Sequence, residues 1–227
     1  MSKNIFITGT GTDVGKTFVT GLIVKKLREA GKKSAYYKAA MSGNERKKDG
    51  SLILGDALWV KETAGISQPL EEMCPYIYEN AYSPHLASRI EGNPVKMEVV
   101  KQGFAQVCKK YDYVTMEGSG GILCPLCFDE GKMQLEDVIK ELSLASIVIA
   151  DAGLGTINGV VLTVEYMKSR QMPVKGLIFN HYHPGNIMEE DNKKMCEYMT
   201  GLPVLACVQD GDTDLKIDID VLTALYE

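Results

Sequence analysis

A glycine-rich segment near the start of the chain, TGTGTDVGKT from Thr8 to Thr17, ends in a lysine and a threonine. It joins an apolar run at 4–9, which predicts a buried strand, to an amphipathic stretch at 16–31, which predicts a helix. Backbone N–H groups and the positive end of a helix attract an anion at such a junction. Lys16 can then reach the β- and γ-phosphates of a nucleotide, and the Thr17 hydroxyl can bind Mg²⁺. The segment therefore predicts a nucleotide phosphate loop.

The spacing departs from the strict pattern G-x-x-x-x-G-K-[ST], because Thr10 stands where that pattern has its first glycine. The glycines lie instead at positions 9, 11 and 15. A glycine-rich turn with a solvent-exposed lysine is the alternative. The order of strand, glycine-rich turn, Gly-Lys-Thr and amphipathic helix favours the phosphate loop.

An acidic residue, Glu117, ends the strand predicted at 111–118 and is followed by Gly-Ser-Gly-Gly. Ligands of α/β sheets bind beyond the carboxyl ends of the strands, which is where this carboxylate would lie. It can reach the Mg²⁺ of a nucleoside triphosphate directly or through water, and the glycines allow the backbone to approach a ligand closely. Glu117 could otherwise simply begin a turn, but a phosphate loop in the same chain favours the metal role.

Two further residues, Lys38 and Asp56, are expected at the same place. Lys38 ends the strand predicted at 33–38, so its amine would lie beside the phosphates. Asp56 opens the helix predicted at 55–65 after a long polar loop. The alternatives are a solvated lysine and an acid that favours the positive end of a helix.

A Cys-x-x-Cys pair, Cys124 and Cys127, follows the same strand. A zinc site needs two more ligands, for which His181 and His183 are candidates, but these follow a different predicted strand. Redox pairs of this spacing usually open a helix, whereas Pro125 stands between these cysteines and a polar loop follows. We therefore expect no thiol or metal function at this pair.

Strand and helix patterns alternate along the chain, and the predicted strands are apolar throughout. This combination predicts an α/β fold of the P-loop NTPase type, with a mainly parallel sheet covered by helices on both faces. No linker or repeat divides it, so we expect one domain at 1–227. The strands are predicted at 4–9, 33–38, 111–118, 145–151, 174–180 and 203–208, and the helices at 16–31, 55–65, 83–92, 93–111, 134–143, 156–171, 186–201 and 222–227.

The composition limits the possible partners. The 227 residues carry a net charge of −5, and the lysine pairs are scattered among acids, which is typical of solvated faces and not of a nucleic-acid surface. No apolar run reaches the roughly 18 residues of a membrane helix, and glycine interrupts the first residues too early for a secretory signal. We expect a cytoplasmic enzyme with six reduced cysteines and no nucleic-acid or membrane partner.

Taken together and in order, the motifs resemble those of the dethiobiotin synthetase family, the ATP-dependent carboxylases of biotin biosynthesis. FITGTGTDVGKT at 6–17 is similar to that family's F-x-T-G-T-x-T-x-V-G-K-T loop, which also has threonine where the strict pattern has glycine. The other similar segments are YYKAAMSG (36–43), GDAL (55–58), PYIYENAYSPHLAS (75–88), VTMEGSGG (114–121), GTINGVVLTVE (155–165) and GLIFN (176–180).

The resemblance implies a P-loop α/β domain, a homodimer, and a reaction that uses ATP and Mg²⁺. The substrates are 7,8-diaminononanoate and CO₂, and the products are dethiobiotin, ADP and phosphate. A carbamate forms on one amine, ATP phosphorylates it to a mixed anhydride, and the second amine closes the cyclic urea. Gly155–Asn158 would begin a helix whose N-terminus takes the substrate carboxylate, and in the family this helix belongs to the dimer partner.

The resemblance also implies a role for each site residue. Lys38 would stabilise the carbamate and the phosphate, and Lys16 would hold the transferring phosphate. Mg²⁺ would be bound by Thr17, Asp56 and Glu117. The implied nucleotide-binding residues are Asp13, Val14, Gly15, Lys16, Thr17, Phe18, Asp56, Glu117, Gly118, Ser119, Gly120, Asn180 and His181, with Asn180 at the adenine. The implied diamine site contains Thr12, Ser42, Gly155, Thr156, Ile157 and Asn158.

The chain departs from the family pattern at a few positions. Ala39 replaces a common proline, Ser119 replaces alanine, and His181 stands where an acid is common. The usual Ile-Pro near the last strand is absent, which leaves the base and ribose contacts at 208–210 and the strictness of the ATP preference open.

A partner-regulated ATPase of the chromosome- or septum-positioning type is the second candidate on the same fold. Those proteins carry an extra lysine at the start of the loop, in K-G-G-x-x-G-K-T, where this chain has Thr10. Many also use a basic or amphipathic tail, whereas the C-terminal segment here is acidic. The related cobyrinate-amidating enzymes need a fused glutaminase domain, for which this chain is too short.

Overall fold

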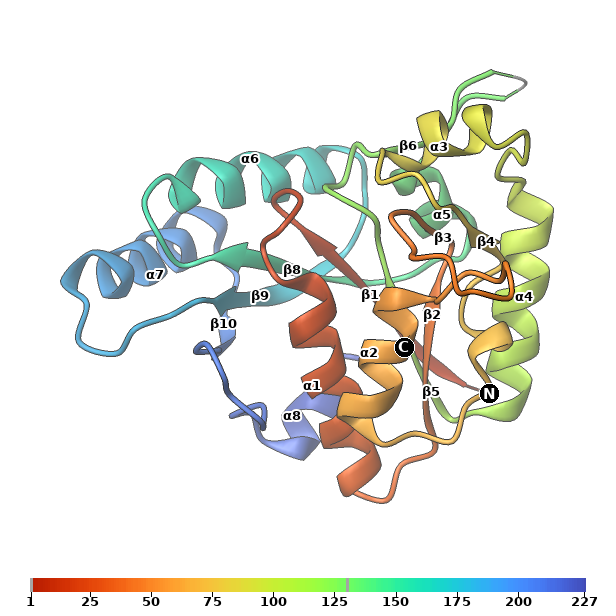
Figure 1. The fold of residues 1–227 in the computed structure, drawn as a ribbon. Coiled ribbons are helices and arrows are strands. Elements are labelled where there is room, and N and C mark those ends of the chain that lie inside the picture. Colours follow the sequence, from red (N-terminus) through yellow and green to blue (C-terminus); the bar gives the residue numbers. More distant parts are fainter. Residues whose placement is uncertain (1, 130) are drawn as a thin grey trace.

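Six parallel strands form the central sheet of the computed structural model, which describes residues 2–129 and 131–227 (Figure 1). The order across the sheet is β10-β9-β8-β1-β5-β2, so the first strand lies inside the sheet and β2 at one edge. The mainly parallel α/β sheet predicted from the sequence is thereby confirmed. The strands are β1 (Lys3–Gly9), β2 (Ser34–Lys38), β5 (Tyr113–Glu117), β8 (Ser146–Asp151), β9 (Val174–Asn180) and β10 (Val204–Cys207).

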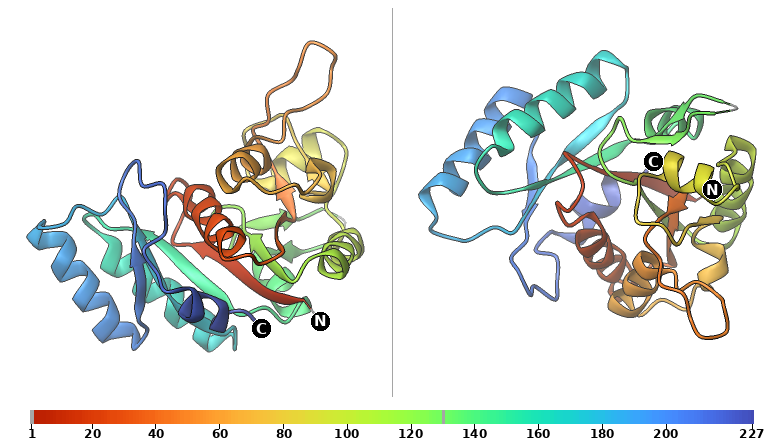
Figure 2. Two further views of the ribbon diagram at one scale, coloured as in Figure 1. Left: turned by 90° about the horizontal axis from the view of Figure 1, so that it is seen from below. Right: turned by 45° about the horizontal axis from the view of Figure 1, so that its top comes forward.

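Helices cover both faces of the sheet, which explains why its central strands are almost completely buried (Figures 1 and 2). Side chains of a strand alternate between the two faces. Ile5 and Ile7 pack with α1 (Lys16–Glu29) and α8 (Ile219–Ala224) on one face. Phe6 belongs to the cluster on the other face, which is formed with α4 (Met97–Lys110), α5 (Leu135–Glu141), α6 (Thr156–Ser169) and α7 (Ile187–Thr200).

Shorter elements surround the edge of the sheet near β2. Helix α2 packs on α1, and the loop at 44–52 projects away from the body of the molecule (Figure 2). Two small sheets pair β3 with β4 in parallel and β6 with β7 antiparallel. These elements are α2 (Gly55–Ala64), α3 (Pro84–Ile90), a 3₁₀ turn (Leu70–Glu72), β3 (Ala40–Met41), β4 (Tyr76–Ile77), β6 (Pro125–Cys127) and β7 (Met133–Gln134).

The predicted start of one helix was wrong. The fourth helix begins at Met97 and not at 93, because Pro94 disfavours a helical backbone at the residue before it. Ser83 occupies the N-cap position of α3 and Pro84 follows it, while the Ser83 hydroxyl bonds the His85 ring at 2.8 Å. A loop follows the Cys-x-x-Cys segment as expected, but 125–127 itself pairs as a strand with 133–134, which was not predicted.

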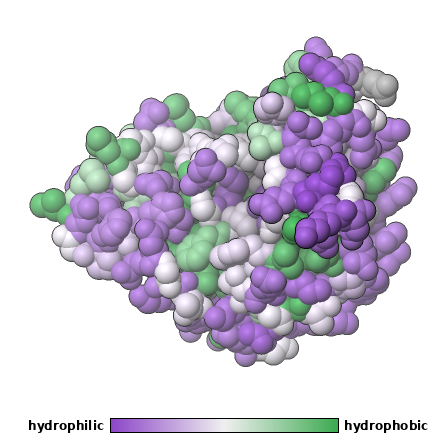
Figure 3. Space-filling model, in the orientation of Figure 1, coloured by the Kyte–Doolittle hydropathy of each residue, from purple (hydrophilic) through white to green (hydrophobic). Residues whose placement is uncertain are grey.

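One face of the molecule is largely polar. On this face, seen in Figure 3, hydrophilic residues predominate and apolar groups form separate areas. In the part of the chain that the structure describes, no helix has the length and apolar character needed to cross a membrane.

Close contact between α1 and α2 depends on a glycine. The ring of Trp59, the only tryptophan, packs on Phe18 with 5.5 Å between ring centroids and also covers Gly21. A Cβ atom at Gly21 would lie 2.4 Å from that ring, so α1 and α2 could not keep this spacing with any other residue there.

We predict that Gly21→Ala destabilises the fold by about 1–3 kcal/mol, because overpacking outweighs the gain in helix propensity. Denaturant unfolding followed by Trp59 fluorescence measures this change. Gly55→Ala is the matched control, since a Cβ there meets only one atom, Asn44 Oδ1 at 4.0 Å. Equal stability of the two variants would contradict the packing explanation.

Candidate active site

The carboxyl ends of β1, β2 and β5 bring the predicted site residues to one place. Glu117, the last residue of β5, lies in register with Lys38 on β2 and with Ile7 on β1. The glycine-rich loop leaves β1 two residues further on and enters α1 at Lys16. Parallel pairing therefore places the loop, the lysine and the acid at the same edge of the sheet.

The loop has a backbone that suits few residues other than glycine. Gly15, the N-cap of α1, has φ 81°, and Asp13 has φ 60°, both in the left-handed region. A Cβ at Gly15 would lie 2.0 Å from Asn180 Nδ2, so no side chain fits at this position. The loop is thereby held directly against the end of β9.

Lys16 is folded back onto its own loop. Its Nζ donates to the Gly11 carbonyl at 2.6 Å. Burial lowers the pKa of Lys16 below its ordinary value, while Glu117 opposes that shift and Lys38 adds to it. A dianionic phosphate group would supply the counter-charge that this partly desolvated ammonium lacks.

Lys38 lies between two carboxylates. Its Nζ is 2.7 Å from Glu117 Oε1 and 2.6 Å from Asp56 Oδ2, and the side chain is almost completely buried. Burial opposes the charged form, but the attraction of Glu117 and then of Asp56 outweighs it and raises the pKa of Lys38. The site therefore contains a permanently charged ammonium.

Glu117 is the centre of this network. The Thr17 hydroxyl donates to its Oε1 at 2.9 Å and the Tyr36 hydroxyl to its Oε2 at 3.1 Å, in addition to the bond from Lys38. The carboxylate is 1 % exposed, so these partners replace water.

The oxygen atoms at this point fit a magnesium ion. Hydroxyl and carboxylate oxygens of Thr17, Asp56 and Glu117 are the hard donors that Mg²⁺ prefers. Among the described residues no cluster of three His, Cys, Asp or Glu side chains could enclose a metal alone. In nucleotide sites Mg²⁺ is usually bound by one or two carboxylates together with the phosphates.

No role was predicted for Tyr36, although it binds Glu117. Tyr36 precedes Lys38 by two residues in β2, so both side chains lie on the same face of the strand, and both bind Glu117. Tyr37 points to the opposite face and donates to the Val100 carbonyl at 2.9 Å. Side chains alternate between the two faces of a strand, so counting back from Lys38 would have placed Tyr36, and not Tyr37, on the face of the lysine.

The glycine-rich segment after Glu117 contacts the phosphate loop. Gly120 has φ 64°, and a Cβ there would be 3.7 Å from Thr12 Oγ1 and 3.5 Å from the Cys124 sulfur. A Cβ at Gly118 would be 2.6 Å from Leu135, and the Ser119 hydroxyl donates to the Ala40 carbonyl at 2.8 Å. The segment is thus fixed on both sides.

Cys124 lies beside the site although no function was expected for it. Burial raises the pKa of its thiol, and Lys16 and then Lys38 pull in the opposite direction. Cys127 is buried on β6, and all six cysteines are free thiols. The Cys124 thiol borders the site, and among the described residues no metal-ligating or redox partner lies beside it.

The N-terminus of α6 also reaches the loop. Gly155 has φ 91° and precedes the helix, and a Cβ at Gly159 would be 3.4 Å from Thr10 Cβ. The hydroxyl of Thr156 is buried and has no hydrogen-bond partner. Ile157 and Asn158 follow in the first turn, with Asn158 exposed, whereas Ser42 directly follows β3.

Asn180 and His181 lie at the other side of the loop. Asn180 Nδ2 donates to the Val14 carbonyl at 3.3 Å, and its Oδ1 is buried without a partner. His181 has φ 53°, and its Nδ1 lies 2.9 Å from Asp151 Oδ2. The free amide oxygen is an acceptor suited to an exocyclic amino group of a base.

Phe18 was expected to contact the nucleotide, but its ring packs on Trp59 in the contact between α1 and α2. Only the backbone of Phe18, in the first turn of α1, is left to face a phosphate.

Comparison with known proteins identifies full-length relatives. A family model described as an AAA domain matches residues 3–213. Proteins named ATP-dependent dethiobiotin synthetase BioD are 49% identical over 228 residues in Brachyspira hyodysenteriae, covering 100% of both chains, and 45% identical over 227 residues in Clostridium botulinum, covering 100% of this chain and 99% of that one. The protein of that name from Clostridium perfringens is 45% identical over 222 residues, with 98% and 97% covered.

Solved structures share the fold at low identity. The MinC:MinD cell division protein complex of Aquifex aeolicus has a TM-score of 0.55 at 12% identity, covering 98% of this chain and 86% of that chain. Cell division protein FtsY of Thermotoga maritima has a TM-score of 0.51 at 14% identity, covering 99% and 68%. At these identities the likeness concerns the fold alone.

We predict that Tyr36→Phe raises the Mg²⁺ concentration needed for half-maximal nucleotide binding by about tenfold, since a hydrogen bond to a charged group contributes about 1.5–3 kcal/mol. Mg²⁺ titration of nucleotide binding, followed by calorimetry, measures this shift. Tyr37→Phe is the matched control from the same strand and should leave the Mg²⁺ dependence unchanged. A similar shift in both variants would mean that Tyr36 acts only on stability.

Proposed function

This chain belongs to the ATP-dependent dethiobiotin synthetase family, and from that membership we propose how its own residues carry out the reaction. The enzyme is a cyclo-ligase that uses ATP to form the ureido ring of dethiobiotin in biotin biosynthesis. Its substrates are 7,8-diaminononanoate, CO₂ and ATP, and ADP and phosphate are released.

In the first step one amine of the diamine attacks CO₂ and loses a proton, which gives a carbamate. Lys38 stabilises the negative charge on the carbamate oxygens. The observation that supports this role is the ammonium held 2.6 Å from Asp56 and 2.7 Å from Glu117 at the end of β2, because those carboxylates keep it charged and fixed.

In the second step a carbamate oxygen attacks the γ-phosphorus of ATP, and the bond to the β-phosphate oxygen breaks. Phosphoryl transfer depends on positioning and on neutralising charge. We assign these roles to the phosphate loop. The backbone of Asp13, Val14 and Gly15 positions the phosphates, and the side chain of Lys16 neutralises their charge. Lys16 leaves the Gly11 carbonyl to bind them.

In the third step the second amine attacks the carbonyl carbon of the carbamic-phosphoric anhydride. The carbon–oxygen bond to phosphate breaks as the ring closes, and the departing phosphate takes up the proton that the amine loses. Thr12 and Ser42 line the diamine, and Lys38 accompanies the departing phosphate. Gly118, Ser119 and Gly120 let the backbone approach the reacting groups.

Thr17, Asp56 and Glu117 would hold Mg²⁺, which neutralises charge on the phosphates when it is bound. In the resting structure Thr17 and Lys38 already hold Glu117, so the oxygen ligands are prepositioned by protein hydrogen bonds. Asn180 contacts the adenine through its free amide oxygen, and His181 lies beside it in place of the acid common in the family.

The substrate carboxylate binds at the N-terminus of α6 from a second subunit, at Gly155, Thr156, Ile157 and Asn158. Exposed apolar side chains near this helix support a homodimer: Leu154 is 91% exposed, Leu162 63% and Leu123 51%. We further propose that the whole chain acts as a single domain in the cytoplasm.

The second candidate, a partner-regulated ATPase, is not favoured. Its support would be the likeness to the MinC:MinD complex, but at 12% identity that likeness concerns the fold alone, whereas the synthetase relatives match at 45–49% over the full chain. The phosphate-loop lysine position that distinguishes the ATPases is Thr10 here.

The function is tested by ADP release with and without the diamine in bicarbonate buffer. We expect turnover that depends on the diamine and on Mg²⁺. ATP hydrolysis that ignores the diamine and responds to DNA or lipid vesicles would support the ATPase instead.

Lys38→Gln should lower turnover by at least 10²-fold, because a preorganised charge that stabilises the developing anion is lost. Nucleotide binding, measured by calorimetry, should remain within a few-fold of wild type. A comparable loss of binding and turnover would show that Lys38 serves the nucleotide and not the carbamate.

Mixed dimers test the shared site. Lys38→Gln and Asn158→Asp should each be almost inactive, the second because a new carboxylate repels the substrate carboxylate. Random mixing should restore about a quarter of wild-type activity, since half of the dimers then carry one intact site out of two. No recovery on mixing, with dimers verified by light scattering, would place each α6 N-terminus in its own subunit's site.

A further inference from the structure

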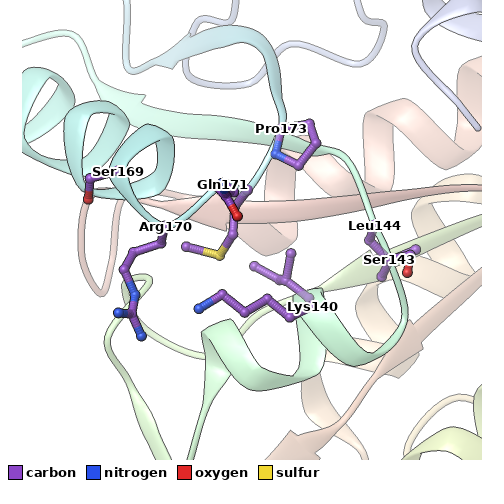
Figure 4. A pocket seen from close by; sticks show the side chains of 9 residues that line it. Lys140, Ser143, Leu144, Ser169, Arg170, Gln171 and Pro173 are labelled. Atoms are coloured by element: carbon purple, nitrogen blue, oxygen red, sulfur yellow. The ribbon is translucent and has the colours of Figure 1, made fainter.

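A pocket lies near the amino ends of β8 and β9, between the C-terminal turns of α5 and α6. Its volume is about 630 Å³, within the range of small-molecule sites. Figure 4 shows Lys140 of α5 extending toward Arg170, which directly follows α6. The catalytic residues do not line this pocket.

Two cationic side chains lie at this pocket, and both contact the same buried glutamate. Arg170 Nη2 donates to Glu136 Oε1 at 2.8 Å, and Lys140 Nζ is 3.5 Å from the same oxygen. Glu136 is 4% exposed and also accepts from the Tyr166 hydroxyl at 2.8 Å. The hydrogen bond from Arg170 lowers the pKa of Glu136, so one buried anion faces two cations. No acidic side chain lines the pocket among the described residues, so Arg170 and Lys140 are the charged groups that would face a ligand there.

Two polar residues that line this pocket have a backbone conformation in which glycine would be less strained. They lie two positions after the ends of α5 and α6: Ser143 with φ 52° and Gln171 with φ 59°. Such positions are usually glycine. Both side chains nevertheless line the pocket, from two unrelated helices.

The floor of this pocket is apolar. Ile139, Leu144, Met172 and Pro173 line it, and the first three are buried. A phosphate has no apolar part and would leave this surface uncovered. A carboxylate on an alkyl chain would bind the two cations through its charge and cover the apolar floor with its chain.

From these features we infer that the α5–α6 pocket is a binding site for a small monocarboxylate with an apolar chain. Arg170 and Lys140 bind the carboxylate, Ser143 and Gln171 add hydrogen bonds, and the apolar floor receives the chain. Dethiobiotin, the enzyme's own product, belongs to this chemical class. The inference concerns binding to the resting protein and stands independently of the catalytic roles proposed above.

Calorimetric titration of the full chain with sodium octanoate tests this site. Wild type should bind octanoate saturably, and excess inorganic phosphate should not displace it. Lys140→Gln should weaken binding at least tenfold. Arg46→Gln is the matched control, because it also removes an exposed cation, paired with Glu79, outside this pocket.

A double variant, Ser143→Gly with Gln171→Gly, separates binding from folding. Glycine relieves the left-handed backbone, so the Tm should not fall, while octanoate affinity should drop several-fold. Absence of saturable binding by wild type, equal affinity in Lys140→Gln and Arg46→Gln, or displacement by phosphate would each overturn the inference.

Discussion

A single buried carboxylate, that of Glu117, organises this end of the molecule. A carboxylate without water needs charged and hydrogen-bonding partners, and removing one partner of a buried ion pair costs about 3–5 kcal/mol. Its partners come from three elements: Lys38 and Tyr36 from β2, Thr17 from α1, and, through Lys38, Asp56 from α2. The energetic need to neutralise Glu117 therefore fixes the distances between these elements as well as the geometry of the site.

The chemistry makes use of this arrangement. A lysine that stabilises an anion must stay charged in a place from which water is excluded, and two carboxylates accomplish that for Lys38. Lys16 has no such fixed partner and rests on a carbonyl, so burial lowers its pKa. The two lysines thus differ in their counter-ions. Lys38 is paired with carboxylates of the protein, whereas the counter-ion of Lys16 would be the nucleotide phosphate.

The local sequence patterns were sufficient to predict the parallel sheet, its alternation with helices and the meeting of Lys38, Asp56 and Glu117. Each of those follows from strand ends and glycine-rich turns, which are local signals. The period of two would have placed Tyr36 on the face of Lys38, but its bond to Glu117 also depends on the register of β2 with β5. The cluster around Glu136 depends on how α5 meets α6, which no local pattern predicts. The two-residue strands β3, β4 and β7 were missed since so short a run has no period, and only pairing with a distant segment defines it.

The position of β1 has a consequence for how the chain folds. This first strand is bonded on one side to β5 and on the other to β8, so both of its edges stay open until residue 117 has been synthesised, and one of them until residue 151. Glu227 then bonds Asn4 at the start of the same strand. An apolar strand with two unpaired edges is a template for association between nascent chains. Its protection, by a chaperone or by transient local collapse, is a requirement that this topology places on the cell.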